Sequence, residues 1–233
     1  MILLFQVSTR WIVAINTSFV AYDFSMSKAP RVTELLHLFA LSLWFGCLAT
    51  TSAAAAVLFS TLKELDPVAP GFMKYPQDHW VIIGGSVGAR LFGICDTVQL
   101  FCAGIALATF GVTLARTKKV PDVKPWGLVA RAIMISIAMG LVSYQLFILA
   151  PRMNAELVQF WSAAQAGEFE VAQSHRALFD QDHPIASTVM GVTAVTVLIA
   201  WFFGAFALSS TGDRTAAETP RNLQEPELLG KAR

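Results

Sequence analysis

Residues 35–58 read LLHLFALSLWFGCLATTSAAAAVL and contain no Asp, Glu, Lys or Arg. The hydrocarbon core of a bilayer is about 30 Å thick, and an α-helix rises about 1.5 Å per residue. A helix therefore needs about 20 mainly apolar residues to cross the core. This stretch is long enough and apolar enough, so we predict that it forms a transmembrane helix.

Three further stretches have the same character: residues 91–114, 127–149 and 184–208. A helical lead-in from Trp80 fits the second of them, and Pro184 fits the first turn of the last, where its missing N–H costs nothing. Helices are expected because lipid cannot hydrogen-bond to an unpaired backbone. The sequence thus predicts an all-α fold, a membrane four-helix bundle.

The composition agrees with a membrane protein and excludes several other classes. Hydrophobic residues make up 55% of the chain and charged residues 14%, with a mean hydropathy of +0.56. A soluble domain has about 25% charged residues. The net charge of +1 gives no basic field for nucleic acid. The three cysteines, Cys47, Cys95 and Cys102, lie in apolar stretches and are expected to be buried without a disulfide framework.

The basic residues predict the orientation, because cytoplasmic loops are enriched in Lys and Arg. They gather before the first span, between the second and third, and after the fourth: Lys28, Arg31, Arg116, Lys118, Lys119, Lys124, Arg131, Arg214, Arg221, Lys231 and Arg233. The other two loops have fewer basic residues and are rich in Asp and Glu. We therefore expect both termini in the cytoplasm, in a multi-pass protein of a bacterial inner or plasma membrane.

The chain divides into three parts. Residues 1–26 form an N-terminal extension, which we interpret as an interfacial segment or a mis-assigned start, because Met26 opens a natural membrane-protein sequence. Residues 27–210 form the four-helix transmembrane domain. Residues 211–233 are polar and without periodicity, so we expect a disordered cytoplasmic tail.

The connection between the third and fourth spans is expected to be helical. Leu157, Phe160 and Trp161 recur at helical spacing, so the third helix should continue beyond the membrane. Gly167 should end it, and residues 168–179 are typical of a second, separate amphipathic helix.

Short motifs suggest a family. The opening of the first span, with His37, Trp44 and Gly46, resembles the H-L-x-A-L-x-x-W-x-G pattern of the domain-of-unknown-function 4149 proteins, which include relatives of transmembrane protein 205. Pro151 and Arg152 are similar to the P-R signature of that family. The resemblance covers roughly residues 30–210 and implies a compact four-helix membrane bundle, but it implies no activity.

Polar residues inside the spans are the candidate site, because an ionisable group at the centre of a span costs about 2.5–3.5 kcal/mol. Asp96 lies inside the second span. We expect it to form an intramembrane polar cluster in the outer leaflet, with an Asp96–Arg152 ion pair. The predicted cluster comprises Asp96, Gln99, Gln145 and Arg152, with Arg90 and His183 near its mouth. Two interpretations stay open: a contact that fixes helix register, or a cavity that binds an ion, a proton or a small solute.

The four histidines raise the alternative of a metal or haem site. His79, His175 and His183 fall in the outer loops, where Asp78, Asp180 or Asp182 could complete a copper or zinc site. A b-type haem needs two facing histidines within spans, and only His37 approaches that position. We expect His37 to cap the interface or to bond a neighbouring helix. No metal or other cofactor is predicted.

The leading functional hypothesis is a non-enzymatic accessory, assembly or structural membrane component. No nucleophile elbow, phosphate-binding loop or dinucleotide motif is present. Gly84 and Gly88, at G-x-x-x-G spacing, could pack against other membrane subunits or a second copy. The main alternative is a small-solute or ion transporter that uses the cluster around Asp96. A weaker alternative is a copper- or haem-binding membrane protein. The expected surroundings are the lipid bilayer, without nucleic acid.

Overall fold

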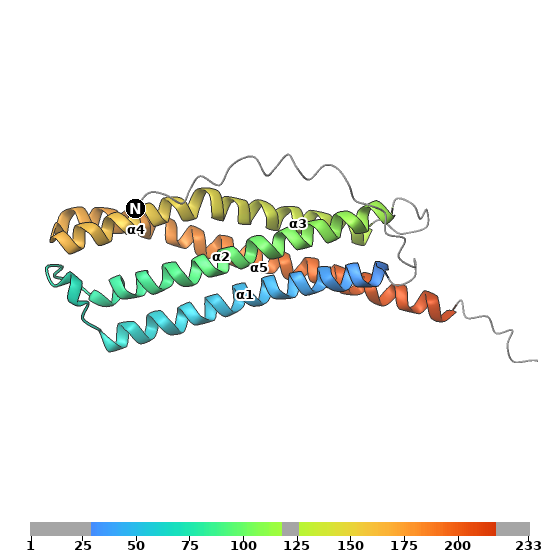
Figure 1. Ribbon diagram of the computed structural model, residues 1–233, viewed down its shortest axis with the longest axis horizontal. Helices are drawn as coiled ribbons and strands as arrows, with labels where there is room; N and C mark the ends of the chain where they lie inside the picture. The colour runs from blue at the N-terminus through green and yellow to red at the C-terminus, as the bar shows by residue number, and fades with distance from the viewer. Residues whose placement is uncertain (1–28, 118–125, 218–233) are drawn as a thin grey trace, which may run out of the picture.

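The computed structural model describes residues 29–117 and 126–217. The predicted N-terminal extension (1–26) and the loop lysines at 118, 119 and 124 lie outside the described residues. Of the predicted tail, positions 218–233 also lie outside them. The described part is all-α, as predicted (Figure 1).

Five α-helices and two short helical turns make up the described chain. In order they are α1 (Ala29–Leu65), the 3-10 turn η1 (Pro70–Phe72), α2 (His79–Thr117), α3 (Trp126–Tyr144), the π-helical turn η2 (Gln145–Leu149), α4 (Ala150–Ala166) and α5 (Phe169–Ala217). Because η2 joins α3 to α4 without a break, these three elements form one rod. The described helices therefore make four long rods: α1, α2, α3–η2–α4 and α5. Each is long and apolar enough to cross a membrane: Val32–Leu65, His79–Arg116, Trp126–Ala166 and Phe169–Phe206.

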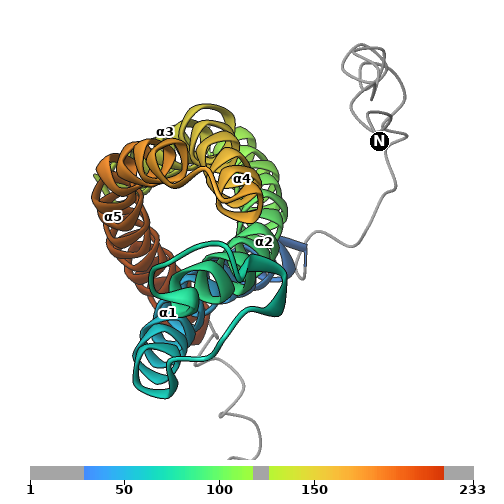
Figure 2. The ribbon, with the colours of Figure 1, turned by 90° about the vertical axis from the view of Figure 1, so that its left-hand side faces the viewer.

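The rods alternate in direction and form a ring (Figure 2). The α1 helix packs along α2, and α5 packs against α1, α3 and α4. The fourth side is sparse, since α2 meets α3 and α4 at few points. We name the two ends of the bundle by what they carry: the η1 end holds η1 and the α4–α5 turn, and the Arg131 end holds the start of α3.

Two apolar cores hold the rods together. The larger one joins α1, α2, α3 and α5 around Trp44 and Val197, which are fully buried. The smaller one lies at the η1 end, where Tyr75 packs edge-on against Phe160 of α4. These cores fix how each rod is rotated about its own axis, and so which of its polar residues face inward.

Glycines allow the closest approach between α1 and α2. A Cβ at Gly84 would lie 2.8 Å from Phe59 Cε1, and a Cβ at Gly88 would lie 3.1 Å from Phe59 Cζ. The G-x-x-x-G spacing is therefore used inside the chain, by the ring of Phe59 on α1.

The helix boundaries confirm some predictions and correct others. The third rod extends beyond the predicted span to Ala166, and Gly167 ends it with φ of 86°, a backbone conformation that glycine adopts at little cost. The prediction of a separate helix at 168–179 and of a fourth span starting at Pro184 is wrong. The α5 helix is continuous from Phe169 and contains Pro184. It also continues to Ala217, into the segment predicted to be a disordered tail.

The physical reason is that one proline removes only one helical hydrogen bond. The turns before Pro184 are held by other contacts: Arg152 of α4 forms an ion pair with Asp182, and Phe179 packs against the core at the η1 end.

Candidate functional site

A cavity of about 470 Å³ occupies the η1 half of the bundle. It lies on the sparse side of the ring, between α2, the η2–α4 segment and α5, and Phe59 of α1 completes its wall. On α2 the lining runs from Trp80 to Asp96, which corresponds to about 24 Å of helix. The cavity therefore extends from the η1 end to the middle of the bundle.

The wall is mainly apolar and rich in aromatic rings: Phe59, Trp80, Phe92, Phe160 and Phe179 line it. The ionisable groups stand at its two ends. Asp96 and Gln145 lie at the inner end, whereas Arg176, Asp180 and His183 lie near the η1 end. An apolar body with few polar groups is the usual composition of a small-molecule site.

Asp96 has no cationic partner among the described residues. Its Oδ1 accepts a hydrogen bond from Gln99 Nε2 at 3.2 Å, and Gln99 Oε1 accepts one from Trp44 Nε1 at 3.2 Å. Gln99 is buried in the larger core and does not line the cavity. This chain of bonds from α1 holds the Asp96 side chain in place.

Gln145 lines the cavity and has a buried side-chain oxygen without a partner. It is 7% exposed, and its Oε1 has no hydrogen-bond partner. Among the described residues, the other buried side-chain atom without a partner is Trp161 Nε1. A buried acceptor without a partner costs about 1–3 kcal/mol, so a ligand that donates to Gln145 would recover that cost.

The position of Gln145 follows from the turn that it begins. In η2 the backbone N–H of Ala150 donates to the carbonyl of Gln145, five residues back instead of four. Pro151 comes next and has no N–H to continue the regular pattern. Such π turns within a helix are frequent at functional sites. Here the turn places Gln145 at the middle of the bundle.

The structure brings together four of the six predicted cluster residues: Asp96 accepts a hydrogen bond from Gln99, and Asp96, Gln145 and His183 line the same cavity. The predicted Asp96–Arg152 ion pair is wrong. Both guanidinium nitrogens Nε and Nη2 of Arg152 donate to the carboxylate of Asp182 instead. Arg90 is exposed and is not part of the lining.

Two of the outer histidines are bound to other partners. His79 accepts from the backbone N–H of Ala69 and its other nitrogen lies 3.0 Å from the Tyr75 carbonyl, while His175 lies 2.7 Å from Glu156. Within residues 29–117 and 126–217, no group of three or more His, Cys, Asp or Glu side chains is placed to hold a metal ion. The hypothesis of an outer copper or zinc site with Asp78, Asp180 or Asp182 therefore finds no support in the geometry.

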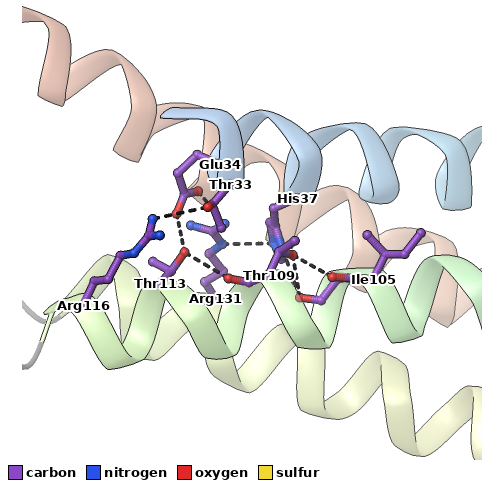
Figure 3. A network of polar contacts seen from close by, with 9 residues as sticks. Thr33, Glu34, His37, Ile105, Thr109, Thr113, Arg116 and Arg131 are labelled. Carbon is purple, nitrogen blue, oxygen red and sulfur yellow. Dashed lines mark hydrogen bonds and ion pairs between the residues drawn. The ribbon is translucent and has the colours of Figure 1, made fainter. Parts of the chain in front are cut away.

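A second polar cluster lies at the Arg131 end, and the sequence analysis did not predict it (Figure 3). Arg131 of α3 is 2% exposed and forms an ion pair of 2.7 Å with Glu34 of α1. Glu34 also accepts from Thr113 Oγ1 of α2 at 2.7 Å. On α5, a Cβ at Gly204 would lie 3.5 Å from the Arg131 guanidinium carbon. All four rods therefore meet around one buried arginine.

His37 belongs to the same cluster, and its protonation follows from its neighbours. Arg131 Nε can only donate, and it lies 3.2 Å from His37 Nε2. His37 Nε2 must therefore be the unprotonated nitrogen. The proton is on Nδ1, which donates to Thr109 Oγ1 at 2.8 Å and to the Ala106 carbonyl at 3.1 Å. His37 is thus a neutral imidazole that bonds to α2, one of the two roles expected for it.

The sequence holds a signal for this cluster. The basic residues near the span ends include Arg131 and predict orientation, whereas Glu34 is not among the predicted site residues. Both lie one to two turns from a helix end, within apolar surroundings. The motif residues divide between the two clusters, since His37 lies in the second one and Trp44 supports Asp96 through Gln99.

Comparison with models of known protein families, with curated proteins and with solved structures gave no match. The resemblance to the domain-of-unknown-function 4149 proteins stays a prediction.

Proposed function

We propose that this polytopic membrane protein is a non-enzymatic carrier that takes a small, mainly apolar organic molecule into the cavity between α2, α4 and α5. The single observation that carries the proposal is the shape of that cavity. It has an aromatic wall, reaches the middle of the bundle, and ends at Asp96 and the unpartnered Gln145.

The opposite half of the bundle supports a carrier because it is closed. There Arg131, Glu34 and His37 fill the space between the rods with a buried hydrogen-bonded network. A binding site near the middle of the membrane is typical of transporters, and this cavity ends near the middle of the bundle. The basic residues of the sequence orient the open half toward the extracytoplasmic side. A reporter inserted at Lys119 tests this orientation, and we expect it to stay in the cytoplasm.

The carrier takes precedence over the accessory or structural role that the sequence favoured. That role places partner subunits on the Gly/Ala-rich faces and on the helical outer loop. One of these faces, at Gly84 and Gly88, packs against Phe59 within the chain.

A cavity-filling substitution tests the proposal. A Cβ at Gly93 meets no atom within 4 Å, and Gly93 lines the cavity, so Gly93→Phe adds bulk at the cavity wall from an open position. Gly104→Phe is the matched control, because Gly104 is on the same helix, is equally open and does not line the cavity.

Tritiated 1-adamantanamine and 1-adamantanol serve as compact apolar probes, measured by equilibrium dialysis against the purified protein and by uptake into proteoliposomes. We expect at least one probe to bind and enter, with at least a tenfold loss in Gly93→Phe and no loss in Gly104→Phe. Binding of neither probe to the folded protein, or equal binding to both variants, refutes the proposed function.

A further inference from the structure

The inner end of the cavity offers hydrogen-bond acceptors and a carboxyl group. Among the described residues, no unpaired cationic side chain lines it. The charged residues in the lining are Asp96, Asp180 and Arg176. Arg176 Nε lies 3.7 Å from Asp180 Oδ2, and its Nη1 donates to Gln77 Oε1 at 3.4 Å, so its charge is engaged near the η1 end. Asp96 therefore faces the cavity without a counter-charge among the described residues.

A carboxylate in this position is costly unless something neutralises it, because the surroundings cannot solvate the charge. Gln99 supplies one hydrogen bond to Asp96 Oδ1. The second acceptor, Gln145 Oε1, has none. A ligand group that satisfies both must carry N–H or O–H donors, and a positive charge on it would also compensate Asp96.

The aromatic walls of the cavity also favour a positively charged ligand. The faces of Phe, Tyr and Trp rings attract cations by about 0.5–2 kcal/mol, more strongly where water is excluded. Five aromatic side chains line this cavity, and Phe92 stands one turn of α2 from Asp96. An anionic or a purely aliphatic molecule would forgo both this attraction and the pairing with Asp96.

We propose that the ligand of the cavity is a protonated amine with an apolar body, which places its ammonium group between Asp96 and Gln145. This inference rests on the proposed function and names its substrate class. Asp96 acts as the counter-ion, Gln145 Oε1 accepts a second N–H, and the aromatic walls hold the apolar body.

The test compares three probes of one shape and different charge: 1-adamantanamine, 1-adamantanol and 1-adamantanecarboxylate. Each is measured at pH 7 by equilibrium dialysis against the full chain in detergent. We expect the amine to bind at least tenfold more tightly than the alcohol, and the carboxylate to bind most weakly.

The Asp96→Asn variant keeps the size of the side chain and an oxygen for Gln99. We expect it to bind the amine no better than the alcohol, while Asp96→Glu keeps the preference for the amine. Thr97→Val is the matched control, because Thr97 is exposed on the same helix and its hydroxyl bonds only to the Gly93 carbonyl among the described residues.

Two results overturn the inference and leave the proposed function intact: equal affinity for the amine and the alcohol, or an unchanged amine preference in a folded Asp96→Asn protein. Tightest binding of the carboxylate also overturns it. If none of the three probes binds to the wild-type protein, the proposed function itself is refuted.

Discussion

Breaking the Glu34–Arg131 ion pair should cost far more stability than its location near a helix end suggests. Arg131 is 2% exposed and Glu34 is 15% exposed, with 2.7 Å between Nη2 and Oε2. Removing one partner of a buried ion pair typically costs about 3–5 kcal/mol, because it leaves the other charge without compensation. We therefore expect Arg131→Met to lower the free energy of unfolding by about 3 kcal/mol. Glu34 keeps its bond from Thr113, which places this cost at the lower end of the range.

Glu34→Leu should cost more, about 4 kcal/mol, since the stranded guanidinium is the more deeply buried group. The double variant Glu34→Leu/Arg131→Met leaves no charge unpaired, and replacing a buried pair by apolar residues of similar volume is often near neutral. We expect it to lose about 1–2 kcal/mol, mainly from the hydrogen bond to His37. The coupling energy is then about 5–6 kcal/mol.

The assay is equilibrium unfolding of the purified protein in mixed micelles with increasing SDS, followed by tryptophan fluorescence, as a double-mutant cycle. The pair of Arg176 and Asp180 is the control, because Asp180 is 61% exposed and 3.7 Å separates Arg176 Nε from Asp180 Oδ2. An exposed ion pair contributes about 0–1 kcal/mol. Additive losses at Glu34 and Arg131, or a coupling energy no larger than that of the control pair, would refute the reasoning.

Two further predictions concern the contact between α1 and α2. Gly84→Ala should destabilise the protein by about 1–2 kcal/mol in the same assay, because its Cβ would lie 2.8 Å from Phe59. Gly46→Ala is the control: its Cβ meets open space, so it should be neutral or stabilising, and equal effects of the two variants would contradict the packing. Mild oxidation with copper phenanthroline should join Cys47 and Cys95, whose sulfurs lie 3.5 Å apart, into a disulfide detected by mass spectrometry. Absence of this cross-link, or its persistence after Cys47→Ser, would count against the register of the two helices.

The sequence by itself determined the four rods. Apolar runs of this length have few alternatives to a membrane helix, because an unpaired backbone is costly in lipid. It also determined the end of the third rod, since Gly167 adopts a backbone conformation that other residues rarely do. Asp96 was a candidate from the sequence for the same kind of reason: a carboxyl within a span is costly wherever it points.

Only the tertiary structure decided how each rod is rotated and which polar groups meet. Arg152 binds Asp182 and leaves Asp96 facing the cavity, a choice between two acids that periodicity does not make. Arg131 points into the bundle, although an arginine at that position of a span could equally extend to the lipid headgroups. The physical reason is that hydrophobicity fixes where a helix lies along the membrane normal, whereas its rotation depends on the fit of side chains from all four rods at once.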